Sequence, residues 1–128
     1  MRCLIVDDSP EFVAAARTLL ERDGITVVGV ASTIADALRH FDELRPDVTL
    51  VDLDLGGESG FELAEKLADA RDSARMSVIL VSTHAEQDFA DMIAGSPAAG
   101  FLAKSGLTTE AIRDLVRQSA GLEEGDHR

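Results

Sequence analysis

The chain has 128 residues, enough for one compact domain with one hydrophobic core. Hydrophobic residues make up 45% of it, which excludes a disordered chain, and the absence of Trp and Tyr means that the core must be largely aliphatic. Acidic residues outnumber basic residues 24 to 12, and the resulting formal charge of -12 argues against direct binding of nucleic acid or of an anionic membrane surface.

Cysteine content and hydropathy predict the compartment. Cys3 is the only cysteine, so no internal disulfide can form, and its apolar neighbours indicate a core residue. No stretch approaches the roughly 18 to 20 apolar residues that cross a bilayer. Asp7 and Asp8 interrupt the first apolar run too early for a signal peptide. We therefore expect a cytoplasmic protein.

Short apolar runs of strand length alternate with helical patterns five times along the chain. The predicted strands are 3–6, 26–30, 48–51, 78–81 and 100–103, of which the last is inferred partly from the rhythm. Apolar residues spaced three or four apart predict helices around residues 12–20, 34–41, 61–67, 89–93 and 112–116. Ser9 before Pro10, and Thr33 with Asp36, are typical of helix starts.

This alternation predicts the fold class. It implies an α/β protein of (βα)5 type, with a doubly wound parallel five-stranded sheet and helices on both faces. The predicted domain covers residues 1–121. Residues 122–128 are polar and lack apolar periodicity, so we expect a frayed tail.

The ends of the predicted strands carry the polar residues of interest. Ligands of open parallel sheets bind at the carboxyl ends of the strands, where this sequence has Asp7-Asp8, Asp52, Ser82 and Lys104. Two carboxylates 4 Å apart repel by about 4 kcal/mol at an effective dielectric near 20. Neighbouring carboxylates therefore need neutralisation, and oxygen ligands favour Mg²⁺, with Mn²⁺ as an alternative, over zinc.

These groups suggest phosphoryl chemistry. A lysine opposite a metal can hold a phosphoryl group from two sides, and a hydroxyl such as that of Ser82 can donate a hydrogen bond to a phosphoryl oxygen. The carboxylate of Asp52 can act as the nucleophile in an in-line displacement.

A family resemblance rests on these residues as a set. Asp7-Asp8-Ser9, Val51-Asp52-Leu53-Asp54-Leu55, Ser82 and Gly100-Phe101-Leu102-Ala103-Lys104 resemble the receiver domain of two-component response regulators, over nearly the whole chain. The resemblance implies a flavodoxin-like fold with strand order 2-1-3-4-5. It also implies that the chain is a phosphoacceptor switch and not an enzyme with turnover, with a phosphohistidine on a sensor histidine kinase or histidine phosphotransfer protein as the donor.

The resemblance also assigns roles to individual residues. Asp52 would accept the phosphoryl group. Asp8 and Asp52 would bind Mg²⁺ directly, together with the backbone carbonyl of Asp54, and Asp7 would act through water. The remaining roles fall on Lys104 as a phosphoryl ligand, Ser82 as the switch hydroxyl and Phe101 as the switch aromatic.

The sequence departs from the common receiver pattern near the acceptor. Thr83 stands where many receivers have Ala or Gly, so we expect it to narrow phosphoryl access. Gly56 occupies a loop position where Pro is common, which should loosen the loop after Asp52. Neither change removes a reacting group.

The same residues are compatible with other functions. Asp52-Leu53-Asp54 also resembles the motif of haloacid-dehalogenase phosphohydrolases, although that motif normally opens its domain and no cap follows here. A binding module that is never phosphorylated is a further alternative. A metal-dependent nuclease is disfavoured by the charge, and a flavin domain by the lack of a phosphate loop after the first strand. For a receiver, the face of the fourth helix, fifth strand and fifth helix should switch, with a homodimer through it as a further expectation.

Overall fold

A computed structural model describes residues 1–70, 77–84 and 86–125. Five parallel strands form one sheet in the order β2-β1-β3-β6-β7. Their bounds are Arg2–Val6 for β1, Thr26–Ala31 for β2, Val48–Asp52 for β3, Ser77–Ser82 for β6 and Gly100–Ala103 for β7. In order along the chain these are the five expected strands, and their spatial order is the expected 2-1-3-4-5.

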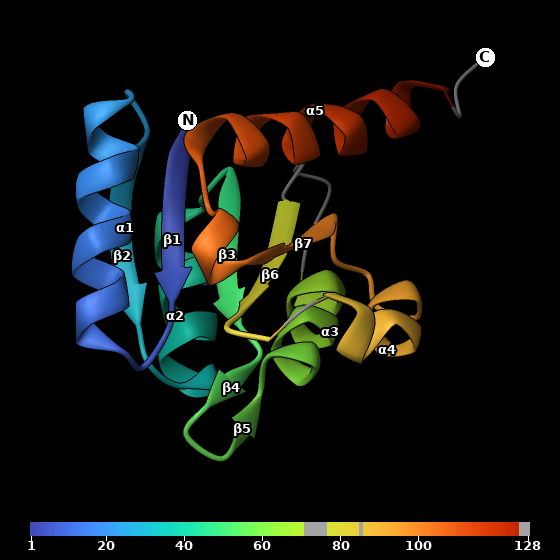
Figure 1. The fold of residues 1–128 in the computed structure, drawn as a ribbon, viewed down its shortest axis with the longest axis horizontal. Coiled ribbons are helices and arrows are strands. Elements are labelled where there is room, and N and C mark those ends of the chain that lie inside the picture. The colour runs from blue at the N-terminus through green and yellow to red at the C-terminus, as the bar shows by residue number, and fades with distance from the viewer. Residues whose placement is uncertain (71–76, 85, 126–128) are drawn as a thin grey trace.

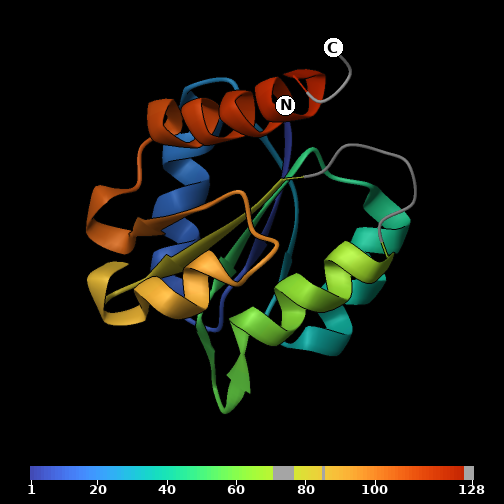
Figure 2. The same cartoon turned by 90° about the vertical axis from the view of Figure 1, so that its right-hand side faces the viewer.

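Helices cover both faces of the sheet. Figure 2 shows α1 and α5 on one side and α2 and α3 on the other. The helices are α1 at Pro10–Arg22, α2 at Ile34–Leu44, α3 at Gly60–Ala70, α4 at Ala90–Ala94 and α5 at Thr109–Gly125, with 3-10 turns η1 at Glu86–Phe89 and η2 at Lys104–Gly106. The doubly wound α/β architecture predicted from the sequence is confirmed.

Alternation along the strands divides the core into two layers. On β1, Cys3 and Ile5 pack with residues of α1 and α5, whereas Leu4 and Val6 pack with residues of α2 and α3. The β1 side chains from Cys3 to Val6 are fully buried, which explains the continuous apolar run of a central parallel strand. Burial raises the pKa of the Cys3 thiol to about 12, in agreement with a core residue.

The helix starts follow the capping residues. The hydroxyl of Ser9 accepts a hydrogen bond from Phe12 N at 3.3 Å, with Pro10 in the first turn. The hydroxyl of Thr33 accepts one from Asp36 N at 3.1 Å. Each cap lies within three residues of the end of a strand, so the first turn of each helix lies beside the carboxyl edge of the sheet.

A short antiparallel hairpin follows β3 and was not predicted. Its strands are β4, Asp54–Leu55, and β5, Glu58–Ser59. The two residues between them, Gly56 and Gly57, have φ of 64° and 102°, which a two-residue turn of this kind requires. Figure 1 shows the hairpin projecting from the edge at which β1 and β3 end.

The described residues end with α5. This helix continues to Gly125. Helical structure therefore extends past residue 121, after which the sequence predicts a frayed tail. Residues 126–128 of the predicted tail lie outside the described residues, and the boundary of the domain at residue 121 stays a prediction. Across the ranges described, no helix has both the length and the apolar character needed to span a bilayer.

Candidate functional site

Three carboxylates converge at the carboxyl edge of the sheet, as the sequence predicts. Asp7 and Asp8 follow β1, and Asp52 ends the adjacent strand β3. One carboxylate oxygen from each lies within 4.8 Å of the other two. Asp7 and Asp52 are buried, at 2% and 6% exposure, whereas Asp8 faces solvent. Two of the three carboxylates are thus buried, and the third is open to solvent.

The cluster has the donor chemistry that a hard divalent cation requires. Asp7 Oδ1 accepts a hydrogen bond from Ser9 N at 2.8 Å, and the buried Asp7 Oδ2 lies 2.8 Å from Lys104 Nζ. One ammonium group cannot neutralise three clustered carboxylates, so a divalent cation would compensate the remaining charge. Oxygen-only donors at this spacing fit Mg²⁺ or Mn²⁺ rather than zinc.

Lys104 brings a positive charge into the cluster. Its Nζ lies 2.8 Å from Asp7 Oδ2 and 3.3 Å from Asp52 Oδ2, and its side chain is 14% exposed. Burial lowers the pKa of Lys104, but the contact with Asp7 and the charge of Asp52 outweigh it, so that its pKa is raised. The lysine therefore remains an ammonium group at neutral pH, and it partly neutralises the carboxylates.

The Asp52 carboxylate is held at both oxygens. Oδ1 accepts a hydrogen bond from Asp54 N at 3.2 Å, and Oδ2 accepts one from Lys104 Nζ at 3.3 Å. Burial raises the pKa of Asp52, and the charge of Asp7 adds to this effect, more than the Asp54 N–H and Lys104 lower it. The carboxylate is thus fixed in orientation and poorly solvated.

Ser82 ends β6, the strand next to β3, and Thr83 follows it. Ser82 is 4% exposed, and its hydroxyl oxygen accepts a hydrogen bond from His84 N at 3.0 Å. The ring Nδ1 of His84 lies 3.5 Å from the same oxygen. Thr83 is exposed immediately beside this turn. Its effect on access, like the switching role of Ser82, stays a prediction.

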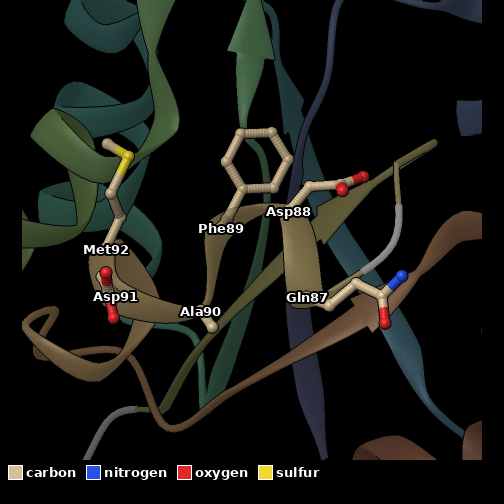
Figure 3. Close-up of a pocket in the computed structure, with 6 residues that line it drawn as sticks. All are labelled: Gln87, Asp88, Phe89, Ala90, Asp91 and Met92. Atoms are coloured by element: carbon tan, nitrogen blue, oxygen red, sulfur yellow. The ribbon is translucent and has the colours of Figure 1, made fainter.

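Phe101 is part of the hydrophobic core. It lies on β7 with 8% exposure, in the core layer that faces α2 and α3. The segment of η1 and α4 lies next to β7 and contains Phe89. The ring centroid of Phe89 lies 6.3 Å from that of Phe61 and 5.9 Å from that of His84. Figure 3 shows Phe89 and Met92 projecting from the same side of this segment, and Met92 is 55% exposed. The predicted rotamer change of Phe101 is not tested by one conformation.

The loop after Asp52 forms the β4–β5 hairpin, with Gly56 in its turn. This residue is half of the hairpin turn, and a Cβ placed on it would lie 3.1 Å from Asp8 Oδ2. Glu58, past the turn, accepts a hydrogen bond from Ile34 N at the start of α2. Gly60 lies so close to the backbone of Asp52 that a Cβ would come within 2.3 Å of its carbonyl oxygen. The expectation that Gly56 loosens this loop stays a prediction.

Two contacting residues were not anticipated from the sequence. The ring of Phe12 on α1 lies under Lys104, with Nζ 4.4 Å from the ring centroid. The carboxylate of Glu58 reaches α2, 24 residues away in the chain. Phe12 had been assigned only to an apolar stripe. The pair Gly56-Gly57 between short runs was a usable hairpin signal.

Comparison with known proteins shows the family of the chain. The family model of the response regulator receiver domain matches residues 3–117. Response regulator UvrY of Escherichia coli K12 is 34% identical over 85% of this chain and 50% of its own length. The DNA-binding transcriptional activator EvgA of the same strain is 29% identical over 81% of this chain and 50% of its own length.

A solved structure extends the similarity to three dimensions. A response regulator protein from Burkholderia pseudomallei, determined with a phosphorylated aspartic acid, calcium ion and citrate, superposes with a TM-score of 0.78 at 25% identity, covering 98% of this chain and 72% of that one. The chain spans about half the length of UvrY and EvgA. The match over residues 3–117, the sheet order and these relatives show that the chain belongs to the receiver domain family of two-component response regulators.

Proposed function

We propose that Asp52 accepts a phosphoryl group in a Mg²⁺-dependent reaction, and that the chain is a signalling switch without metabolic turnover. The observation that carries this proposal is the pairing of Lys104 with Asp52 Oδ2 at 3.3 Å, inside a cluster of three carboxylates within 4.8 Å of one another. A phosphorylated aspartic acid in the B. pseudomallei relative supports the same chemistry.

The donor in this proposal is a phosphohistidine on a sensor histidine kinase or histidine phosphotransfer protein. A carboxylate oxygen of Asp52 attacks the phosphorus, and the P–N bond to the imidazole breaks. The electron pair of that bond goes to the ring nitrogen, which then takes a proton. The net result is an acyl phosphate on Asp52 and a neutral histidine on the donor.

The residues of the chain prepare this step in three ways. The backbone N–H of Asp54 and the ammonium of Lys104 fix the acceptor carboxylate. The same ammonium can then bind a phosphoryl oxygen, because it is already at the acceptor. Asp7, Asp8, Asp52 and the backbone carbonyl of Asp54 would hold Mg²⁺ (or Mn²⁺). A bound divalent cation supplies neutralisation of the negative charge that builds up on the transferring group.

The switch in this proposal runs through Ser82 and Phe101. The phosphoryl group adds charge and acceptor oxygens next to β6, where the Ser82 hydroxyl would leave His84 N and donate to a phosphoryl oxygen. Phe101 would then repack on β7. The face built from α4, β7 and α5 is next to these residues, and it is our candidate for the output surface, including a homodimer.

Intact mass tests the acceptor directly. The protein is incubated with acetyl phosphate with and without Mg²⁺, as wild type and as Asp52→Ala. We expect a Mg²⁺-dependent mass gain of one phosphoryl group in the wild type and none in the variant. Asp54→Ala is the matched control, because its side chain is exposed and only its backbone is proposed to contribute.

The contrary outcomes separate the alternatives. A wild type that gains no mass under either condition would be a binding module rather than a phosphoacceptor. Rapid release of inorganic phosphate from a small phosphate ester, lost in Asp52→Ala and in Asp54→Ala, would instead support the phosphohydrolase alternative.

A further inference from the structure

Phe12 contacts the lysine of the site from α1. The Lys104 ammonium lies over its ring, with Nζ 4.4 Å from the centroid, while the same nitrogen contacts Asp7 Oδ2 at 2.8 Å and Asp52 Oδ2 at 3.3 Å. The lysine thus has three partners from three elements. Two of them are carboxylates, and the third is an aromatic face.

The position of the ring is fixed by the start of α1. Phe12 N donates to the hydroxyl of Ser9, the N-cap residue, and Ser9 N in turn donates to Asp7 Oδ1. Ring and carboxylate are therefore held by the same capped turn. Phe12 also packs, partly buried, against the core layer that faces α1 and α5. Its ring thus packs against this core layer and also contacts the Lys104 ammonium.

A lysine needs such support to act at a defined point. Its charge sits on a flexible four-carbon stem, and its ammonium is strongly hydrated, so free lysine side chains sample many rotamers. The face of an aromatic ring attracts a cation through its quadrupole, most strongly where water is excluded. Lys104 is 14% exposed, so little water competes at this contact.

We propose that Phe12 is a positioning residue for phosphoryl transfer, whose ring face holds Lys104 Nζ at the acceptor carboxylate of Asp52. This inference rests on the proposed function and adds a residue to it. Phe12 does not touch the reacting atoms. It acts through the lysine, and an aliphatic side chain of similar size would fill the same space without attracting the cation.

A fluorinated series separates this role from simple packing. Phenylalanine analogues with one to five ring fluorines, placed at position 12, keep nearly the same shape while progressively removing the negative charge of the ring face. We expect the rate of Asp52 phosphorylation by acetyl phosphate to fall stepwise along the series, by about two- to thirty-fold in total. The phosphorylation rate of the Phe12→Leu variant should be as low as that of the most fluorinated analogue.

Two controls make the result specific. The same series at Phe61, whose ring contacts Phe89 and not Lys104, should leave the rate unchanged. In a Lys104→Met background, fluorination at Phe12 should have no further effect on the residual rate, because the cation is gone. A merely structural role would persist in that background.

The failures are distinguishable. If the unmodified protein is phosphorylated on Asp52 and the rate does not respond to fluorination at position 12, Phe12 is a packing residue and the inference is wrong. If the unmodified protein gains no phosphoryl group, the proposed function is wrong, and the inference about Phe12 is wrong as well.

Discussion

The side chain of Glu58 accepts a hydrogen bond from the backbone N–H of Ile34 at 3.0 Å. Ile34 is the first residue of α2, and Glu58 belongs to the hairpin that follows Asp52. The first N–H groups of a helix have no partner within the helix, and a carboxylate placed there also interacts favourably with the helix dipole. A hydrogen bond thereby connects the hairpin next to Asp52 to the N-terminus of α2.

Glu58→Ala should destabilise the protein by about 1 kcal/mol, because it removes an acceptor from a helix N-terminus. Urea unfolding followed by far-UV circular dichroism measures the loss. Glu58→Gln is the matched control, since its amide oxygen can still accept from Ile34 N, and it should lose less. Equal losses in the two variants would mean that the charge, rather than the hydrogen bond, provides the stability.

Asp52→Asn should stabilise the metal-free protein at neutral pH. Burial and the charge of Asp7 raise the pKa of Asp52 in the folded state. The folded wild type therefore binds more protons than the unfolded chain between the unfolded pKa of about 3.9 and the higher folded value. Its stability accordingly falls as pH rises through that window, whereas that of the neutral variant does not.

Thermal unfolding in the presence of a chelator, from acid to neutral pH, checks this sign. The advantage of Asp52→Asn should be largest above the folded pKa of Asp52. It should vanish below about pH 3.9, where both side chains are neutral in both states. A wild type more stable than the variant at pH 7 would show that pairing with Lys104 outweighs burial.

Much of the site could be predicted because of the parallel sheet. In such a sheet all strands end at one edge, and the strand order 2-1-3-4-5 that the receiver resemblance implies places the first strand beside the third, so that Asp7, Asp8 and Asp52 meet. Lys104 follows the fifth strand and reaches the same edge. The β-branched runs made four strands recognisable, and their alternation with helices indicated a parallel sheet, whereas the order of the strands followed from the family resemblance.

The contacts that escaped prediction lack a local signal. Phe12 reads as one member of an apolar stripe, and the position of Lys104 over its ring follows only from how α1 packs on the sheet. Glu58 reads as a solvated acid, and its helix cap depends on the approach of two segments 24 residues apart. The hairpin itself had a local signal, because Gly56-Gly57 is a pair that tolerates the positive φ of a tight turn.

Ser82→Ala should permit phosphorylation of Asp52 and weaken the structural response to it. The hydroxyl is proposed to move from His84 N to the phosphoryl group, and alanine cannot make that bond. Amide chemical shifts of β7 and α4, compared before and after phosphorylation, report the response. Ser82→Thr keeps the hydroxyl and should retain most of the shift. An unchanged response in Ser82→Ala would contradict the proposed switch.

Mg²⁺ should raise the unfolding temperature of the wild type. A ligand that binds only the folded state stabilises it by about 2.7 kcal/mol at a hundred times its Kd. Asp8→Asn should abolish most of this increase, because the Asp8 carboxylate is proposed to bind the cation and is the one carboxylate of the cluster that is exposed to solvent. Asp54→Asn should retain it, since only the backbone carbonyl of that residue is proposed as a ligand. An increase that survives Asp8→Asn would place the cation elsewhere.

Gly56→Ala should weaken metal binding, whereas Gly57→Ala should not. Both glycines have positive φ, so alanine at either position should cost about 1–2 kcal/mol of stability. A Cβ at Gly56 would lie 3.1 Å from Asp8 Oδ2 and must displace that carboxylate by a few tenths of an ångström, but a Cβ at Gly57 meets nothing within 4 Å. Titration with Mn²⁺, read by its paramagnetic effect on water relaxation, gives the two affinities. Equal losses of affinity would show that the turn as a whole, and not the contact with Asp8, controls the cation site.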